Sequence, residues 1–235
     1  MRIVAIIPAR GGSKRLPRKN IYSILGKPAI AYTIEAAKES GVLDKIIVST
    51  DDKKIAEISR TYGAQIPFIR PKELATDSAS TYSVIKHAVE FLEKEGEKID
   101  VIVTLQPNSP LLRPEHIKEG IDKFLKGNLN SLLSVTKGFP VWWVLKEEGN
   151  KYVPYVKLES GKNPFNVESQ YLPRSYQPNG AIYITDRDFL LEAGAFVDDK
   201  GTGILFMSEE DSCDVDTEVD IIIIKEIMKK RQGRK

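Results

Sequence analysis

The sequence predicts an α/β fold with a mainly parallel sheet and helices on both faces. Short apolar runs alternate with amphipathic segments from residue 2 to residue 136, and this order is typical of parallel sheets. Apolar residues make up 41% of the chain and charged residues 29%, the balance of an ordinary globular protein. The 235 residues suffice for one domain with a sizeable core, and no internal repeat or low-complexity linker divides them.

The expected elements follow in order from apolar runs and helix-end signals. Residues 2–8 are nearly all apolar and predict a buried strand. The next helix begins near Pro28, because proline suits a first turn, and ends at Ser40 before Gly41. Asp51 can cap the following helix, which runs to Tyr62. Further helices are expected at 81–95, 114–126 and 217–230, and further strands at 45–49, 99–105, 131–136, 180–185 and 203–207.

The segment from residue 137 to about residue 178 breaks this pattern. It lacks helical periodicity, which predicts a hairpin-bearing insertion within the single domain of residues 1–235. Exposed aromatic side chains there need covering, so one explanation is contact with a partner subunit. A satellite core under a long loop is the other explanation, and the sequence does not choose between them. The aromatic and proline residues concerned are Pro140, Trp142, Trp143, Tyr152, Pro154, Tyr155, Pro164, Phe165 and Tyr171.

The strongest functional signal is the loop IPARGGSKRLPRKN, which directly follows the first strand. Its glycines, Gly11 and Gly12, allow backbone N–H groups to approach phosphate oxygens. The loop is neither a Walker A sequence nor a GxGxxG dinucleotide fingerprint. A basic solvated turn is the alternative, but a turn that follows a buried strand favours a phosphate site. The basic residues, whose summed charge suits a triphosphate, are Arg10, Lys14, Arg15, Arg18 and Lys19.

Two further polar segments lie next to predicted strands. LQPNSPLLRPEH, residues 105–116, offers uncharged polar groups from Gln106, Asn108 and Ser109 at the strand end where open α/β sheets bind ligands. A proline-rich turn with a helix cap explains the same residues without a site. QPNGAIYIT, residues 177–185, contains a turn signal at Asn179 and Gly180 before a strand.

The acidic segment EEDSCDVDTEVD, residues 209–220, carries a pair of carboxylates. Asp214 and Asp216 alternate around Val215, so an extended chain places both on one side. Such a pair suits Mg²⁺, which keeps several waters and binds substrate phosphates as well. An acidic helix cap at Asp216 or Thr217 is the alternative, and the two interpretations can coexist.

Bulk properties argue against several classes of protein. A net charge of +2 gives no electrostatic case for binding nucleic acid. The single cysteine excludes an internal disulfide and a multi-cysteine zinc site. No apolar run approaches the roughly 20 residues that span a bilayer, and the N-terminal apolar run lacks the cleavage site of a signal peptide. We therefore expect a soluble, cytoplasmic protein that engages neither nucleic acid nor membrane.

Together these segments resemble the acylneuraminate cytidylyltransferases, the CMP–sialic acid synthetases. The matching motifs are IPARGGSKRLPRKN, RPKELATD, LQPNSPLLR, NGAIYI and DVD, in the order of the family and across nearly the whole chain. The resemblance implies a Rossmann-like nucleotidyltransferase fold and a homodimer whose insertion reaches the neighbouring subunit. It also implies that CTP and an acidic nonulosonic sugar react, with Mg²⁺ as cofactor, to give a CMP-sugar and pyrophosphate.

The resemblance also assigns roles to particular positions. The anomeric hydroxyl would attack the α-phosphate in line, a step that needs positioning and charge neutralisation. Arg10, Lys14 and Lys19 would be catalytic cations, and Asp214 would assist deprotonation. Asp214 and Asp216 would be the metal ligands. Nucleotide binding falls on Ala9, Arg10, Gly11, Gly12, Ser13, Lys14, Lys19, Asn20, Arg70 and Ser80. Sugar binding falls on Gln106, Gln177, Asn179 and Tyr183.

The chain departs from the family pattern at three places. Asn108 stands where the family usually has threonine, and an additional leucine precedes Arg113. Gln177 stands where sialic-acid enzymes often carry arginine, although Arg174 is nearby. Glutamine does not replace an arginine that grips a carboxylate. The resemblance implies sialic acid or a relative as the sugar, and these departures favour legionaminic, pseudaminic or another such acid over N-acetylneuraminic acid.

Three rival functions remain open at the level of sequence. A CMP–Kdo-type synthetase is the first, and Lys19 followed by Asn20 departs from the loop of that enzyme. The second is a non-catalytic sugar-nucleotide binding protein, against which the intact Asp214 and Asp216 argue. The third is a glycosyltransferase, which also pairs a D-x-D motif with a similar sheet but does not call for the basic loop.

Overall fold

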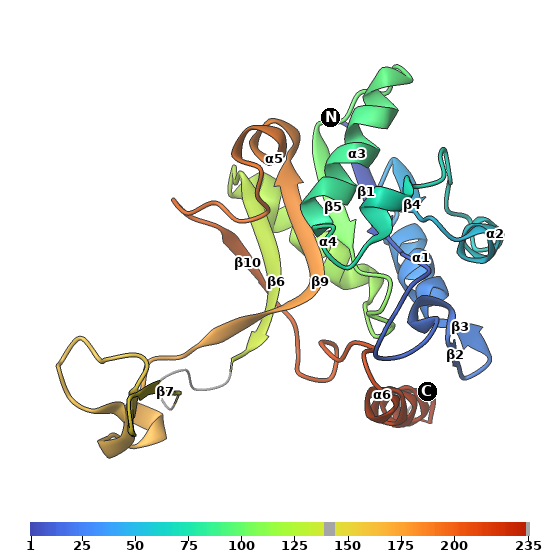
Figure 1. The fold of residues 1–235 in the computed structure, drawn as a ribbon. Helices are drawn as coiled ribbons and strands as arrows, with labels where there is room; N and C mark the ends of the chain where they lie inside the picture. Colours follow the sequence, from blue (N-terminus) through green and yellow to red (C-terminus); the bar gives the residue numbers. More distant parts are fainter. Residues whose placement is uncertain (139–143, 234–235) are drawn as a thin grey trace.

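A single sheet organises the chain (Figure 1). The structure is a computed structural model that describes residues 1–138 and 144–233. Pro140, Trp142 and Trp143, three of the aromatic and proline residues named above, lie outside these described residues. In sheet order the six strands are β10 (Gly203–Phe206), β6 (Ser131–Lys137), β9 (Tyr176–Asp186), β5 (Val101–Leu105), β1 (Ile3–Pro8) and β4 (Lys45–Ser49).

The sheet is mainly parallel, as the sequence predicts. Strand β1 runs parallel to both of its neighbours, β4 and β5, and β10 runs parallel to β6. Strand β9 is the antiparallel member, inserted between β5 and β6. The parallel strands therefore bring their carboxyl ends to the lower edge of the sheet in Figure 1. The loops that carry the sequence motifs start there.

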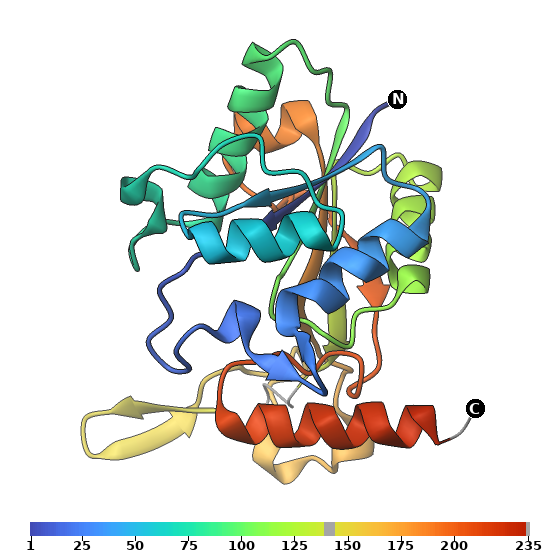
Figure 2. The same cartoon turned by 90° about the vertical axis from the view of Figure 1, so that its right-hand side faces the viewer.

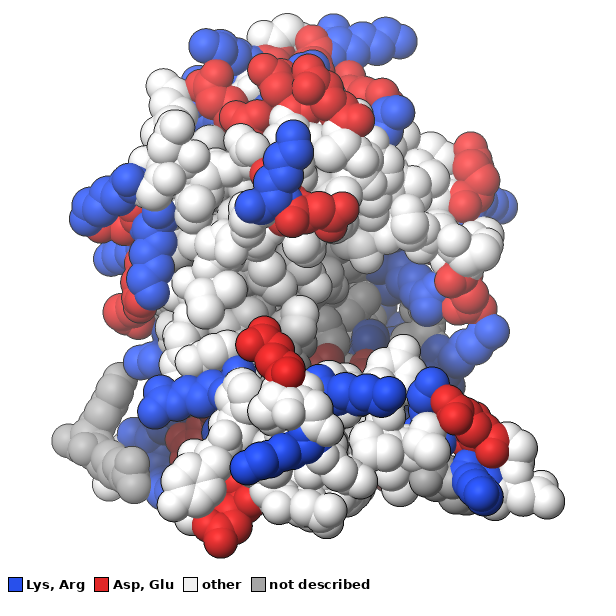
Figure 3. Space-filling model, turned by 90° about the vertical axis from the view of Figure 1, so that its left-hand side faces the viewer, with Lys and Arg blue, Asp and Glu red and all other residues white. Residues whose placement is uncertain are grey.

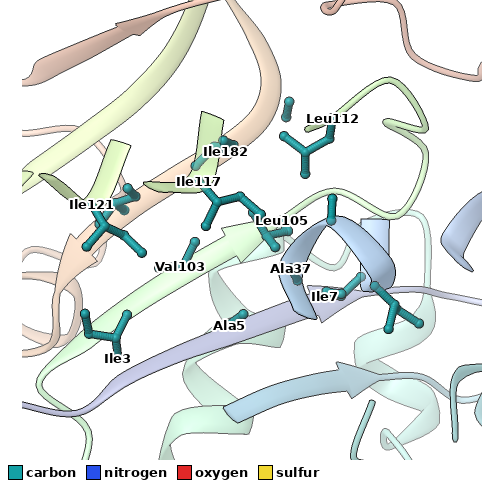
Figure 4. Close-up of a cluster of buried hydrophobic side chains, with 14 of the residues drawn as sticks. Ile3, Ala5, Ile7, Ala37, Val103, Leu105, Leu112, Ile117, Ile121 and Ile182 are labelled. Atoms are coloured by element: carbon teal, nitrogen blue, oxygen red, sulfur yellow. The ribbon is translucent and has the colours of Figure 1, made fainter. Parts of the chain in front are cut away.

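Helices cover both faces of the sheet, which confirms the predicted architecture. The described α-helices are α1 (Ala29–Ser40), α2 (Lys53–Thr61), α3 (Thr81–Lys94), α4 (Pro114–Lys126), α5 (Arg187–Ala193) and α6 (Glu218–Gln232). Helices α1 and α4 pack on one face and α3 and α5 on the other. Strand β1 is buried on both sides: Ile3, Ala5 and Ile7 enter the first cluster (Figure 4), whereas Val4 and Ile6 enter the second. Among the described residues, no helix combines the length and apolar character that crossing a bilayer requires.

A third hydrophobic cluster fixes the carboxyl-end edge of the sheet. Ile221, Ile224 and Met228 of α6 pack against Leu16 from the loop after β1 and Leu111 from the loop after β5. Figures 1 and 2 both show α6 below the sheet at this edge. Thr217 caps α6 by accepting a hydrogen bond from the Asp220 N–H, as expected for one of the two candidate caps. The acidic segment before α6 is thereby held beside the loops that follow β1 and β5.

Two local expectations were wrong, and one helix was missed. Asp52, not Asp51, caps α2, since its carboxylate accepts from the N–H groups of Lys54 and Ile55. Strand β9 begins at Tyr176 and passes through Asn179 and Gly180, where the pairing with β6 shifts in register, so this dipeptide forms a bulge rather than a turn before the strand. Helix α5 was not expected from the sequence.

The insertion carries the predicted hairpin. Strands β7 (Leu145–Glu148) and β8 (Lys151–Pro154) pair in antiparallel fashion, and short 3₁₀ turns follow at Pro164–Asn166 and Ser169–Tyr171. In Figures 1 and 2 this part projects away from the sheet. None of the three hydrophobic clusters formed by the described residues includes a residue between 144 and 175. The described part of the insertion therefore gives no support to the satellite core.

Candidate active site

The loop after β1 is held by restraints from the end of β4. The Gly11 N–H donates to the Asp51 carboxylate at 3.0 Å, and the Ala9 N–H donates to the Ser49 carbonyl at 2.9 Å. A Cβ at position 11 would lie 2.8 Å from Cβ of Asp52, so glycine is required for this close approach. Asp51 therefore ties down the glycine loop instead of capping a helix.

The second half of the loop turns back on the first. Arg18 has a left-handed backbone with φ of 56°, a strained conformation for a residue other than glycine. It leads into the 3₁₀ turn Lys19–Ile21, from which Asn20 Nδ2 donates to the Arg10 carbonyl at 3.0 Å. Oδ1 of Asn20 is buried and accepts no hydrogen bond from the described residues. It is an acceptor that a bound ligand can satisfy.

The cations of this loop are paired with two carboxylates from distant parts of the chain. The ion pairs are Arg10–Asp77 at 2.9 Å, Lys14–Asp77 at 2.6 Å, Arg15–Asp216 at 2.9 Å and Lys19–Asp216 at 2.8 Å. Asp77 is half exposed, and the hydrogen bond from Lys14 lowers its pKa most; burial opposes this shift, and the hydrogen bond from Arg10 and the charges of both cations lower the pKa further. Since both carboxylates are reached by water, an anionic ligand can take their place beside the cations.

A cavity of about 260 Å³ lies beside the loop, and Arg10, Lys19, Asn20 and Arg70 contribute to its wall. Arg70 is nearly fully buried. Its Nε donates to the Ser49 hydroxyl at 3.1 Å and its Nη2 donates to the Ser49 carbonyl. Burial lowers the pKa of Arg70 to about 10, which leaves it protonated at neutral pH. Four of the expected nucleotide-binding residues are thus brought together around one cationic cavity.

The other expected nucleotide-binding residues are not part of the described wall of this cavity. Those residues are Ala9, Gly11, Gly12, Ser13, Lys14 and Ser80. The five loop residues border Arg10 in the chain and build the loop that presents it. Ser80 caps α3, because its hydroxyl accepts from the Ser83 N–H at 3.1 Å, while its neighbours Ala79 and Thr81 line the cavity.

A second cavity, of about 250 Å³, contains the acidic pair. Asp214 and Asp216 both line it together with Lys19, which agrees with their alternation around the buried Val215. Burial, and then the neighbouring charge of Asp216, raise the pKa of Asp214, while Lys19 opposes the shift. Two carboxylates that face one cavity next to Lys19 fit Mg²⁺, which prefers oxygen ligands and completes its shell with waters and phosphate oxygens.

A third cavity, of about 350 Å³, extends the site toward α5. Tyr183 and Phe196 form part of its wall, with their rings 5.3 Å apart between centroids. Gln106 lines all three cavities, so it stands where they meet. Phe196 was missed by the sequence reasoning, because it lies in an irregular segment after α5 that carries no motif.

Of the four residues expected to bind the sugar, three line these cavities and Gln177 is not among the described residues that line them. Gln106 and Tyr183 line the central cavities. Asn179 lies in the wall of the acidic cavity, but its amide is engaged by the protein: Oδ1 accepts from the Ser134 hydroxyl at 2.5 Å and Nδ2 donates to the Ser212 hydroxyl at 2.8 Å. Gln177 is exposed and is not among the described residues that line these cavities.

A larger cavity of about 540 Å³ lies between the sheet and the insertion. Lys137 and Arg174 contribute positive charge to its wall, and Tyr176 and Phe206 contribute aromatic rings that meet edge to face at 6.2 Å. Seen from the side of the insertion, the surface is hollowed between the body of the sheet and the insertion below it (Figure 3). The cavity of about 540 Å³ shares no described lining residue with the three cavities that meet at Gln106.

Comparison with known proteins agrees with this geometry. A family model described as Cytidylyltransferase matches residues 4–170, so the chain belongs to this family and is a nucleotidyltransferase. The chain is 34% identical over 232 residues to pseudaminic acid cytidylyltransferase of Campylobacter jejuni, with 97% of each chain covered. It is 34% identical over 239 residues to CMP-N,N'-diacetyllegionaminic acid synthase of Legionella pneumophila, with 99% of this chain and 98% of that one covered.

A solved structure supports the Rossmann-like nucleotidyltransferase fold. CMP:2-keto-3-deoxy-manno-octonic acid synthetase, solved in complex with CTP, matches with a TM-score of 0.71 at 19% identity. The match covers 98% of this chain and 100% of the other. At this identity the likeness shows the fold alone.

Proposed function

We propose that this protein activates an acidic nonulosonic sugar with CTP, giving a CMP-sugar and pyrophosphate. The observation that carries the proposal is the junction at Gln106, where a cationic cavity, an acidic cavity and a partly aromatic cavity meet. The first suits a triphosphate, the second a divalent cation and the third a sugar. Relatives named for pseudaminic and legionaminic acid support a sugar of this class.

The reaction requires positioning and charge neutralisation more than covalent catalysis. The anomeric oxygen bonds to the α-phosphorus as the bond from that phosphorus to the β-phosphate oxygen breaks, and pyrophosphate leaves. Arg10, Lys14 and Lys19 neutralise the phosphate oxygens when they exchange their present carboxylate partners for the nucleotide. Asp214 is the proposed acceptor of the hydroxyl proton.

We propose Mg²⁺ as the cofactor, held by Asp214 and Asp216. When bound there, it supplies positive charge to the α-phosphate and to the leaving pyrophosphate. With its carboxylate engaged by the cation, Asp216 would leave Lys19 and Arg15 available to the triphosphate.

The proposal is tested by pyrophosphate release. Purified protein is incubated with each of sialic, legionaminic, pseudaminic and Kdo acids, in combination with CTP, UTP, ATP or GTP, with and without Mg²⁺. We expect release with CTP and a nonulosonic acid only when Mg²⁺ is present. Release with Kdo alone would favour the CMP–Kdo synthetase, and no release with any pair would exclude the catalytic proposal.

The oligomeric state and location are proposed on separate grounds. We propose a homodimer, because Tyr155, Phe165 and Tyr171 of the insertion and Phe206 of β10 leave aromatic surface exposed. Covering such surface with a second copy would remove it from water. A cytoplasmic location is proposed because CTP is an intracellular substrate.

A further inference from the structure

We propose that Asn108 is a positioning residue that orients the carboxylate of Asp214 toward a bound cation. The inference rests on the proposed function, since it concerns how the acidic pair is held. Asn108 lies in the loop after β5 and is 9% exposed. Its Nδ2 donates to Asp214 Oδ2 at 2.9 Å and to the Val215 carbonyl at 3.3 Å.

A backbone bond completes this contact. The Val215 N–H donates to the Asn108 carbonyl at 2.8 Å, so residue 108 is joined to residues 214 and 215 by three hydrogen bonds. The Val215 side chain is fully buried in the cluster under α6. With Val215 fixed on one side of the extended segment, Asp214 and Asp216 are fixed on the other, facing the acidic cavity.

The two carboxylates differ in their partners, and this difference points to the role of Asn108. Asp216 is neutralised by Arg15 and Lys19. In the part of the chain that the structure describes, no lysine or arginine lies within ion-pair distance of Asp214, and Asn108 is the one side chain of another residue that donates to it. A neutral amide fixes a carboxylate without cancelling its charge. Asp214 is therefore held in a fixed orientation by a neutral partner, with no ion pair that a bound cation would have to break.

The test measures metal binding directly rather than turnover. Mn²⁺, a paramagnetic stand-in for Mg²⁺, is titrated into the protein and the free ion is followed by electron paramagnetic resonance. Asn108→Leu keeps the number and branching of the side-chain heavy atoms but removes the donor, and Asn108→Ala serves as a smaller second variant without a donor if the first does not fold. We expect Mn²⁺ affinity to fall roughly 10-fold or more in either variant. The circular dichroism spectrum is expected to stay unchanged in both variants, which separates loss of orientation from general damage to the fold.

Two matched controls accompany these variants. Asn130→Ala removes another amide-to-carboxylate hydrogen bond, from Asn130 Nδ2 to Asp198 at 2.9 Å, on the exposed surface. Ser212→Ala loosens the same acidic segment by removing the hydroxyl that Asn179 contacts, without touching Asp214. Both are expected to bind Mn²⁺ as the unmodified protein does.

Each outcome decides a different question. If the Asn108 variants bind Mn²⁺ normally while Asp216→Asn does not, the positioning role is wrong and the metal site stands. If Ser212→Ala loses as much affinity as Asn108→Leu, loosening of the segment explains the loss and the positioning role is again wrong. If Asp216→Asn also binds normally, or the unmodified protein binds no Mn²⁺, the metal site itself is refuted, and the role of Asn108 falls with it.

Discussion

At the scale of single residues, the basic loop is a set of cations that already have counter-ions. Asp77 bridges Arg10 and Lys14, and Asp216 bridges Arg15 and Lys19. Such exposed pairs are individually weak. They lower the positive potential that an incoming triphosphate meets, and they are broken at little cost when it arrives. On the proposed function, these ion pairs compete with the triphosphate for the same cations and so lower the affinity of the loop for it.

Removing one of these counter-ions is expected to strengthen anion binding. In Asp77→Asn, Arg10 and Lys14 lose their carboxylate, so inorganic triphosphate should bind roughly two- to fivefold more tightly at low ionic strength. The gain should shrink as salt is added, because the pairs are exposed. Isothermal titration calorimetry at two salt concentrations measures both effects. Asp188→Asn, which breaks the remote pair with Arg187, is the control; weaker binding in Asp77→Asn than in this control would contradict the expectation.

The sequence predicted the cations of the site better than their partners. Arg10, Lys19 and Asn20 could be chosen because they share a short loop with two glycines. The counter-ion Asp77 and the engagement of Asn179 could not, since both depend on residues far away in the chain. Arg70 also has a partner that the sequence could not predict. Its motif suggested contact with the nucleotide, but its guanidinium also donates hydrogen bonds to Ser49 at the end of β4.

At the scale of elements, the acidic segment is braced between α4 and α6. The Asp211 carboxylate, whose side chain is 5% exposed, accepts from Arg113 at 2.9 Å, from Arg231 at 2.9 Å and from the Ser208 hydroxyl at 2.8 Å. Burial by itself raises the pKa of Asp211, but hydrogen bonds from His116 and Ser208 and the charges of the two arginines outweigh it and lower the pKa. This carboxylate joins the start of α4 to the last turn of α6.

Asp211→Asn should therefore destabilise the protein in a pH-dependent manner. Because the folded pKa lies below the unfolded value of about 3.9, the stabilisation is present above that pH and is lost as the pH falls further. We expect a loss of about 3 kcal/mol in the free energy of unfolding at pH 7, and a smaller difference below about pH 4. Urea denaturation at both pH values measures it, with the exposed Asp122→Asn as control. A difference that stays constant with pH would contradict the assignment to the Asp211 charge.

Helices and strands were predicted correctly where a segment contained both a clear apolar pattern and residues typical of its ends. The helix expected at 114–126 and the strand expected at 45–49 coincide with α4 and β4. Asp51 and Asp52 are neighbours with equal capping ability, so only the approach of Gly11 decides which one is free to cap α2. The bulge in β9 depends on pairing with β6, and α5 has only seven residues, too few for a helical period to stand out.

At the scale of the whole molecule, the insertion is the part that leaves large aromatic side chains exposed to solvent. Its tyrosines Tyr155 and Tyr171 are 66% and 74% exposed, and Phe206 beside the large cavity is 52% exposed. A parallel sheet with helices on both faces could be predicted from short-range patterns. The position of the insertion could not, because no periodic pattern in residues 137–178 links it to the sheet.

Light scattering should therefore report a mass near twice the 26.4 kDa of one chain. Charge placed on the aromatic surface, in the double variant Tyr171→Glu and Phe206→Glu, is expected to shift the protein toward the monomer, because burying two new carboxylates in an interface is unfavourable. Leu125→Glu, on the solvent-facing side of α4, is the control and should leave the mass unchanged. A mass of one chain for the unmodified protein would exclude the homodimer.

The ion pair between Lys19 and Asp216 joins residues 197 positions apart. One wall of the catalytic cleft is therefore translated first and the opposite wall nearly last. During synthesis the emerging chain displays a cationic loop long before the carboxylates that complete the site leave the ribosome. On the proposed function, turnover depends on the arrival of the final segment, and a polypeptide whose translation stops early carries the half proposed to bind phosphate without the half proposed to hold the metal.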